Sequence, residues 1–178
     1  MSKKEIKFSD ERMIDEIRGL ALDMINKSNS SYSNMTLSSA PFMYLLFKDY
    51  MVYDMEKTQW CNRDRFILST PKCSALLYAT MYATTELFTI DELKTYGSIN
   101  SPVSIYPEYN LDRMIEYTTG RDGMGIPYSV GVAMSSKMLG STYNTKKNTL
   151  FDYNTYCLCS HDDLISGTTY EAISLAGE

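Results

Sequence analysis

Apolar residues recur at helical spacing in the first part of the chain. This pattern predicts a helix over residues 9 to 27, with Ser9 as its N-cap. A second helix is predicted over residues 38 to 53, and its apolar and aromatic residues extend around more than one side. That breadth indicates either a deep core position or a surface that another chain covers. The buried face of the first helix is predicted to contain Met13, Ile14, Ile17, Ala21, Met24 and Ile25.

Two short apolar runs, Phe66–Leu68 and Tyr156–Cys159, have the length of buried strands. Because strands alternate with helices, the chain is predicted to be an α/β protein with a parallel sheet. With no visible linker, residues 1–178 are expected to form one domain. The remaining helices are predicted at about 74–88, after the capping-box sequence Thr89-Ile90-Asp91-Glu92, at about 126–139, and from near Gly167.

Charge and hydropathy argue against two kinds of partner. Seventeen basic and 22 acidic residues give a net charge of −5, which lacks the basic excess of a non-specific nucleic-acid binder. No apolar run approaches the ~20 residues of a membrane span, and the N-terminus lacks an apolar signal segment. We therefore expect a cytoplasmic protein that binds neither nucleic acid nor membrane. The four cysteines do not complete a zinc set, so free thiols are expected.

Three segments match, in order and in spacing, the motifs of one enzyme family. They are Asn62–Ser69, Thr118–Gly120 and Gly167–Gly177. On these segments the chain resembles the N-terminal thiamine diphosphate-binding domain of transketolases, over roughly residues 10 to 177. The resemblance implies a thiamine diphosphate-binding fold, with helices flanking a parallel sheet, in a truncated form. The single domain would then be incomplete at its C-terminal end.

The resemblance places three histidines of the family's active site at positions where this chain has other residues. These positions are Tyr32, Lys72 and Tyr106. A phenol or an ammonium group titrates near pH 10, so neither replaces a group that titrates near neutrality. No catalytic residue is therefore expected.

The family's cofactor loop corresponds to the segment Gly120-Arg121-Asp122-Gly123-Met124-Gly125. Asp122 adds a negative charge that would oppose a diphosphate. Lys72 and Arg121 are candidates for a new anion site, since basic groups beside loop amides attract phosphate. The alternative is that both are solvated surface residues. The loop glycines that remain as cofactor-binding candidates are Gly120, Gly123 and Gly125.

At the family's metal-binding aspartate, the resemblance places His161. Mg²⁺ prefers oxygen ligands, and imidazole is a poor substitute. A shift of one residue would instead offer Asp162 as a metal ligand. The family's second ligand, an asparagine, and its catalytic glutamate have no counterpart in these 178 residues. We therefore expect neither thiamine diphosphate nor Mg²⁺ to bind unless a partner chain completes the site.

The residues that match the family are ones that support its fold, whereas the residues that differ lie mainly at the family's catalytic and cofactor-binding positions. This predicts a degenerate, non-catalytic domain that is not active alone. It would act as a structural or regulatory subunit in a homo- or hetero-oligomer with another protein chain. Two alternatives remain open. One is a fragment or small subunit of a thiamine diphosphate- and Mg-dependent transketolase, which transfers a two-carbon ketol unit between sugar phosphates, completed by a partner chain. The other is a binding module for a small phosphorylated ligand.

Overall fold

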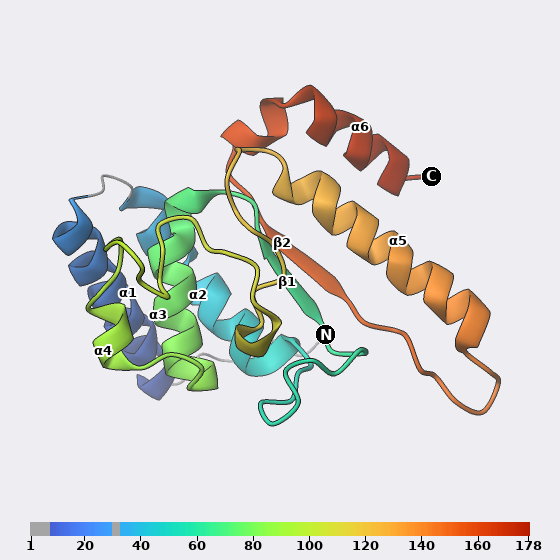
Figure 1. Ribbon diagram of the computed structural model, residues 1–178, viewed down its shortest axis with the longest axis horizontal. Coiled ribbons are helices and arrows are strands. Elements are labelled where there is room, and N and C mark those ends of the chain that lie inside the picture. Colours follow the sequence, from blue (N-terminus) through green and yellow to red (C-terminus); the bar gives the residue numbers. More distant parts are fainter. Residues whose placement is uncertain (1–7, 30–32) are drawn as a thin grey trace. The chain divides into compact units, whose positions relative to one another are not determined.

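The computed structural model describes residues 8–29 and 33–178. They form two compact units. The first unit contains the described parts of residues 1–50 together with residues 75–105, and the second contains residues 51–74 and 106–178. The first unit is helical, whereas the second contains the sheet (Figure 1).

In the first unit, the buried faces of the helices follow the predicted spacing. Helix α1 packs on α2, and all but one of the positions predicted for the buried face of α1 are buried. Near the start of α1, the Tyr44 hydroxyl donates a hydrogen bond of 3.1 Å to Asp10 Oδ1, and Lys48 forms an ion pair with the same oxygen. The elements of this unit are α1 (Phe8–Ser28), α2 (Asn34–Leu45), a π-helical turn (Leu46–Tyr50), α3 (Ser74–Thr85) and α4 (Ile90–Leu93). Ser74, the first residue of α3, belongs to the second unit.

Several helix boundaries differ from the prediction; the second helix begins at Asn34 instead of near residue 38, and the helix predicted over about 126–139 spans Gly125–Tyr143. Helix α1 begins at Phe8, so Ser9 lies in the first turn and the prediction that it is the N-cap was wrong. The second helical region ends at Tyr50, because the next backbone groups bond elsewhere: Val52 N–H and C=O pair with Asp64 at 2.9 and 2.8 Å. Helix α3 ends at Thr85, because Glu86 has a left-handed φ of 57°.

The predicted capping box before α4 is confirmed. The Glu92 amide donates to Thr89 Oγ1 at 3.2 Å, and the Thr89 amide donates to Glu92 Oε2 at 2.8 Å. These reciprocal bonds satisfy two amides that have no partner inside the helix. A helix of only four residues is therefore set by its own local sequence.

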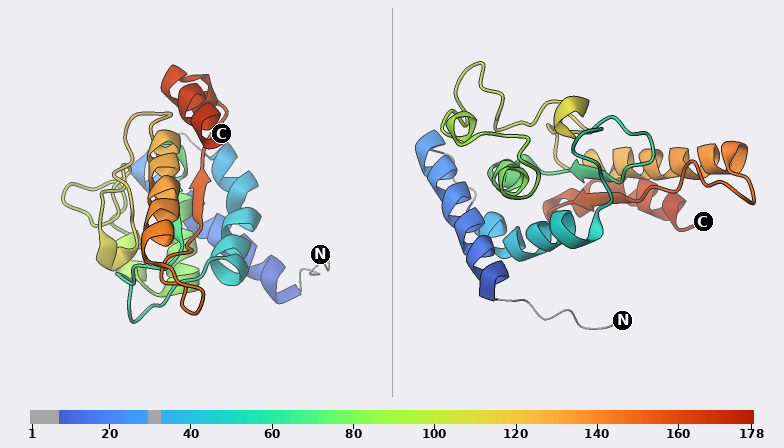
Figure 2. Two further views of the ribbon diagram at one scale, coloured as in Figure 1. Left: turned by 90° about the vertical axis from the view of Figure 1, so that its right-hand side faces the viewer. Right: turned by 90° about the horizontal axis from the view of Figure 1, so that it is seen from below.

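The second unit contains two parallel strands, as the apolar runs predicted. Strand β1 (Arg65–Leu68) pairs with β2 (Thr155–Leu158) in a register that aligns Arg65 with Thr155 and Leu68 with Leu158. Helix α5 (Gly125–Tyr143) packs against both strands, and α6 (Gly167–Ala176) packs on α5 (Figures 1 and 2). The fold class is thus confirmed as α/β with a parallel sheet. Single-turn helices span Pro71–Cys73, Leu111–Arg113 and Asp162–Ile165.

All four cysteines are free thiols, as expected. Burial raises the pKa of Cys157, on β2, to about 12. None of the described helices combines the length and apolar character that crossing a membrane requires.

Candidate functional site

The candidate site lies in the second unit, where both strands end. Because β1 and β2 are parallel, their carboxyl ends lie at the same edge of the sheet. The Ser69 amide, just after β1, donates to the Leu158 carbonyl at 2.9 Å. The loop that precedes α5 reaches the same edge, since Thr119 Oγ1 donates to the Leu68 carbonyl at 2.8 Å. Segments that lie far apart in the sequence therefore meet here.

Lys72 is bound by two carboxylates of this site. Its Nζ lies 2.6 Å from Asp162 Oδ2 and 4.0 Å from Asp122 Oδ2. The hydrogen bond from Lys72 lowers the pKa of the Asp162 carboxyl. The candidate anion-binding lysine and the candidate metal-binding aspartate are therefore paired with each other.

Asp163 is fully buried, and its hydrogen bonds connect the loop before α5 to the segment that follows β2. Its Oδ1 accepts from the Gly123 amide at 2.7 Å, and its Oδ2 accepts from the Ser160 amide at 2.6 Å. The Gly123 carbonyl accepts from Thr169 Oγ1 at 2.7 Å. Both backbone groups of Gly123 are thus satisfied within the chain.

Sequence analysis did not single out Asp163. The signal that could have revealed it is local: an aspartate three residues after Ser160, at the spacing of side chain-to-backbone turns. The bond to Gly123 spans 40 residues and has no such local signal.

The other candidates are distributed around this edge or lie elsewhere. Tyr32 lies outside the described residues. Arg121 and His161 are exposed. Tyr106 is exposed, at 54%. His161 directly precedes the turn Asp162–Ile165, but its side chain makes no capping hydrogen bond there. Within residues 8–29 and 33–178, no three His, Cys, Asp or Glu side chains are grouped so that they could hold a metal ion.

The three loop glycines differ in their surroundings. A Cβ at Gly125 would lie 2.4 Å from Ser69 Cα, whereas one at Gly120 would meet nothing within 4 Å. Gly123 has φ 82°, in the left-handed region that favours glycine, and a Cβ there would lie 2.8 Å from Ser166 Cβ. Gly125 and Gly123 are therefore required by packing and by backbone conformation, independently of any ligand.

We expect Gly125→Ala to lower the free energy of unfolding by about 3 kcal/mol, the upper end of overpacking costs, because the methyl group meets backbone atoms. Urea unfolding followed by circular dichroism would measure the loss. Gly120→Ala is the matched control in the same loop, and its midpoint should stay near that of the parent. Equal stability of the two variants would contradict the close packing of Gly125 on Ser69.

Residues 9–178 match the family described as "Transketolase, thiamine diphosphate binding domain". The chain belongs to this family. Among curated relatives, it is 40% identical over 174 residues to the transketolase of Aquifex aeolicus, and 34% identical over 171 residues to that of Halalkalibacterium halodurans. These matches cover 98% and 96% of this chain, but 25% and 26% of the relatives.

Solved transketolase structures share the fold. The transketolase from Leishmania mexicana superposes with a TM-score of 0.88 at 33% identity, over 94% of this chain and 25% of that one. The transketolase from Campylobacter jejuni gives 0.85 at 31% identity, over 94% of this chain and 26% of that one. The expected transketolase-like domain is thus confirmed. The chain spans about a quarter of the length of these transketolases.

Proposed function

We propose that this transketolase-family domain does not bind the cofactor or catalyse ketol transfer by itself, and acts through contacts with another protein chain. The observation that carries the proposal is the Asp163 carboxylate, which is held by the amides of Gly123 and Ser160. At this edge of the sheet, the amides of Gly123 and Ser160 therefore already bind an anionic group, and that group belongs to the chain itself.

Charge at the site supports the same proposal. Asp122 and Asp162 share one lysine, Lys72, which pairs with both, and the Asp163 carboxylate of the same site is held by backbone amides. A diphosphate would be repelled by the excess negative charge unless a metal ion neutralised it. The donor set does not fit that ion, because Asp162 is taken up by Lys72 and Asp163 by two amides.

The same contacts argue against a module for small phosphorylated ligands. Lys72 would have to leave Asp162 before it could bind a phosphate. Arg121 alone, on an exposed loop, would offer one solvated charge.

A second candidate function is a fragment of a working transketolase that another chain completes. Two buried hydroxyl oxygens favour it: Ser69 Oγ and Ser160 Oγ have no hydrogen-bond partner in the described part of the chain. Both follow a strand at the candidate edge. A polar group supplied by a ligand or by another chain would satisfy them.

The proposal predicts that thiamine diphosphate with Mg²⁺ does not change the thermal unfolding midpoint of the purified chain. A ligand at 100 times its dissociation constant would stabilise the fold by about 2.7 kcal/mol, which is easily measured. The Aquifex aeolicus transketolase, titrated under the same conditions, serves as the positive control. A shift that needs both ligands and disappears in Asp162→Ala would overturn the proposal and favour the fragment of a working enzyme.

A further inference from the structure

A groove of about 470 Å³ lies between α1 and α3 of the first unit. On α1, Met13, Ile17 and Leu20 recur at helical spacing and line one side. On α3, Ala79 and Ala83 lie one turn apart, and their short side chains leave space between the helices. Folded interiors rarely leave space of this size empty, so an apolar hollow at the surface is suited to side chains from another molecule.

The edges of this α1–α3 groove are acidic. Within the described residues, the charged side chains of its lining are Glu16, on α1, and Glu86, just after α3, and both are exposed. Glu16 lies 2.9 Å from Arg12 Nε, whereas Glu86 forms no ion pair in the described part of the chain. A basic group at the edge of the groove would therefore find a carboxylate without a partner.

The surface of α1 beside the groove is acidic as well. Glu11 and Asp15 line an adjoining hollow together with Glu16 and Arg12. Asp15 pairs with Arg18 at 2.9 Å, but Glu11 has no ion-pair partner among the residues that the structure describes. The groove and its border thus carry two negative charges that no described residue neutralises, and both favour a basic partner.

The geometry of the groove favours a helix as its occupant. Backbone groups in the middle of α1 and α3 bond within their own helices, so an extended peptide would find side chains there but no main-chain partners. Met13 and Leu20 are about 10 Å apart along the axis of α1, which is two helical turns. A helix of this length presents apolar side chains at positions i, i+4 and i+7 on one face. Tyr82, 36% exposed at the groove, adds an aromatic face that attracts cations.

We propose that the α1–α3 groove binds an amphipathic helix of a partner protein, whose apolar side chains are flanked by lysine or arginine. The apolar side chains would fill the space over Ala79 and Ala83, and the basic side chains would lie near Glu16 and Glu86. The inference rests on the proposed function, because it names the chemistry of the other protein chain.

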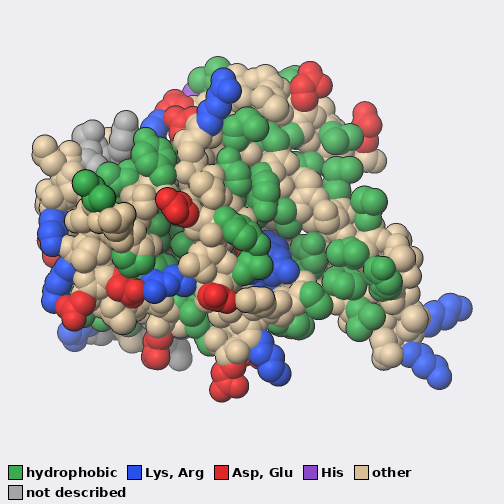
Figure 3. Space-filling view, in the orientation of Figure 1, with side chains coloured by type: hydrophobic (Ala, Val, Ile, Leu, Met, Phe, Trp, Pro, Cys, Tyr) green, Lys and Arg blue, Asp and Glu red, His purple; other side chains and the backbone are tan. Residues whose placement is uncertain are grey.

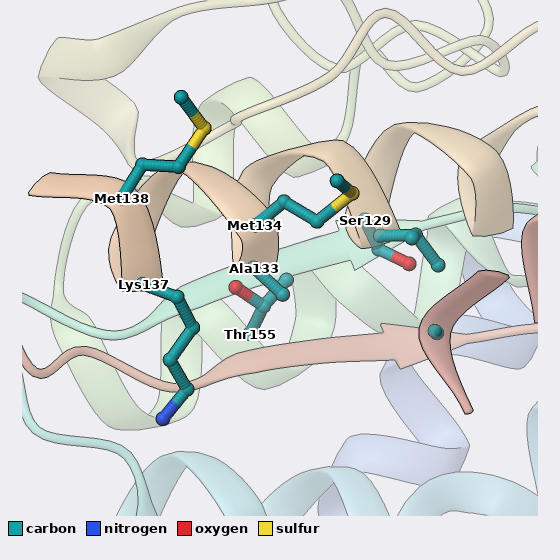
Figure 4. A pocket seen from close by; sticks show the side chains of 8 residues that line it. Ser129, Ala133, Met134, Lys137, Met138 and Thr155 are labelled. Carbon is teal, nitrogen blue, oxygen red and sulfur yellow. The ribbon is translucent and has the colours of Figure 1, made fainter. Parts of the chain in front are cut away.

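A second groove, in the second unit, has a similar volume but the opposite charge. It measures about 500 Å³, and Figure 4 shows Lys137 and Met138 of α5 on one side and Thr155 of β2 on the other. Lys137 is the charged residue of its described lining, and hydrophobic side chains gather over α5 and α6 in the space-filling view (Figure 3). A basic helix that bound through apolar contact alone would enter either groove, whereas charge selects the α1–α3 groove.

The test measures the binding of a fluorescent peptide to the full chain by anisotropy. The peptide has about 16 residues, enough to form a helix, with leucines at i, i+4 and i+7 and lysines beside them. We expect saturable binding that weakens as salt is added. A control peptide, with glutamate in place of every lysine, should bind about tenfold more weakly or not at all, because its charges are repelled.

Ala83→Leu should weaken binding of the lysine peptide about tenfold, because leucine occupies the space that the peptide needs. Ala133→Leu makes the same change in the second groove and should bind the peptide as the parent does. The unfolding midpoint of each variant shows whether it folds. If Ala83→Leu does not fold, the double variant Glu16→Gln with Glu86→Gln, at exposed positions, replaces it and should bind about fivefold more weakly.

The possible results separate this inference from the proposed function. Equal binding of the two peptides, or equal binding by Ala83→Leu and Ala133→Leu, would overturn the inference. A dimer of this chain that Ala83→Leu disrupts would also overturn it, because a second copy would then be the occupant. Binding only after removal of residues 1–7 would assign the groove to the chain's own lysine-containing N-terminus instead. A chain that binds both the lysine peptide and thiamine diphosphate would support the groove and contradict the non-catalytic function.

Discussion

Asp163→Ala is expected to lower the free energy of unfolding by about 3–6 kcal/mol, the largest effect of a single change in the candidate site. The carboxylate accepts two backbone hydrogen bonds, from Gly123 and Ser160, in a fully buried position. Each hydrogen bond to a buried charged group contributes about 1.5–3 kcal/mol. Without the carboxylate, two buried amides lose their partner. Denaturant unfolding of the purified variant would measure the loss.

Asp162→Ala is the matched control. Asp162 is the neighbouring aspartate, but it is exposed and bonds to Lys72, so its removal should leave the unfolding midpoint close to that of the parent. If Asp163→Ala were no more destabilising than Asp162→Ala, the buried amide bonds could not hold the loop to β2. That result would also remove the main support for the non-catalytic function.

Glu116→Gln is expected to destabilise the second unit by about 3–5 kcal/mol, the cost of leaving a buried charge without its partner. Arg63 is 1% exposed and forms an ion pair with Glu116, which is 7% exposed and also lies 3.8 Å from Arg65 Nε through its other carboxylate oxygen. Burial lowers the pKa of the Arg63 guanidinium, and Glu116 opposes that effect. The amide of glutamine keeps the shape of the side chain but removes the charge. Thermal and urea unfolding would measure the change.

Glu108→Gln provides the control, because it makes the same chemical change at an exposed position and should be nearly neutral. The double variant Arg63→Met with Glu116→Leu tests the cause. Replacement of a whole buried pair by apolar residues is often neutral, so the double variant should recover most of the stability. If the double variant is as unstable as Glu116→Gln, the loss comes from packing or from Arg65, which loses its contact with Glu116 in both variants, and not from an unpaired Arg63.

The site residues show why the candidate chemistry could be only partly predicted. Resemblance to transketolases identified the loop glycines and the strand ends, because these depend on short motifs. It did not reveal that Lys72 and Asp162 bind each other, since these residues are 90 positions apart. The two were therefore predicted for opposite roles, one for an anion and one for a metal.

Local sequence determined most of the secondary structure of this protein. The spacing of apolar residues predicted α1, and the capping box predicted α4, because these features depend on residues within about one or two helical turns. The two apolar runs predicted both strands within one residue. Pattern alone misplaced the ends of the second helix and of α3, where the bonds of Val52 and the left-handed conformation of Glu86 end the helices.

The tertiary structure alone decided which charged groups meet. Asp163 bonds to Gly123 across 40 residues, and Arg63, just before β1, pairs with Glu116, in the segment that precedes α5. These pairs form because burial removes water as the competing partner, so each buried charge and amide must find its complement within the fold. The sequence thus determined the family and the helices and strands, whereas packing determined which charged groups of the site bond to each other.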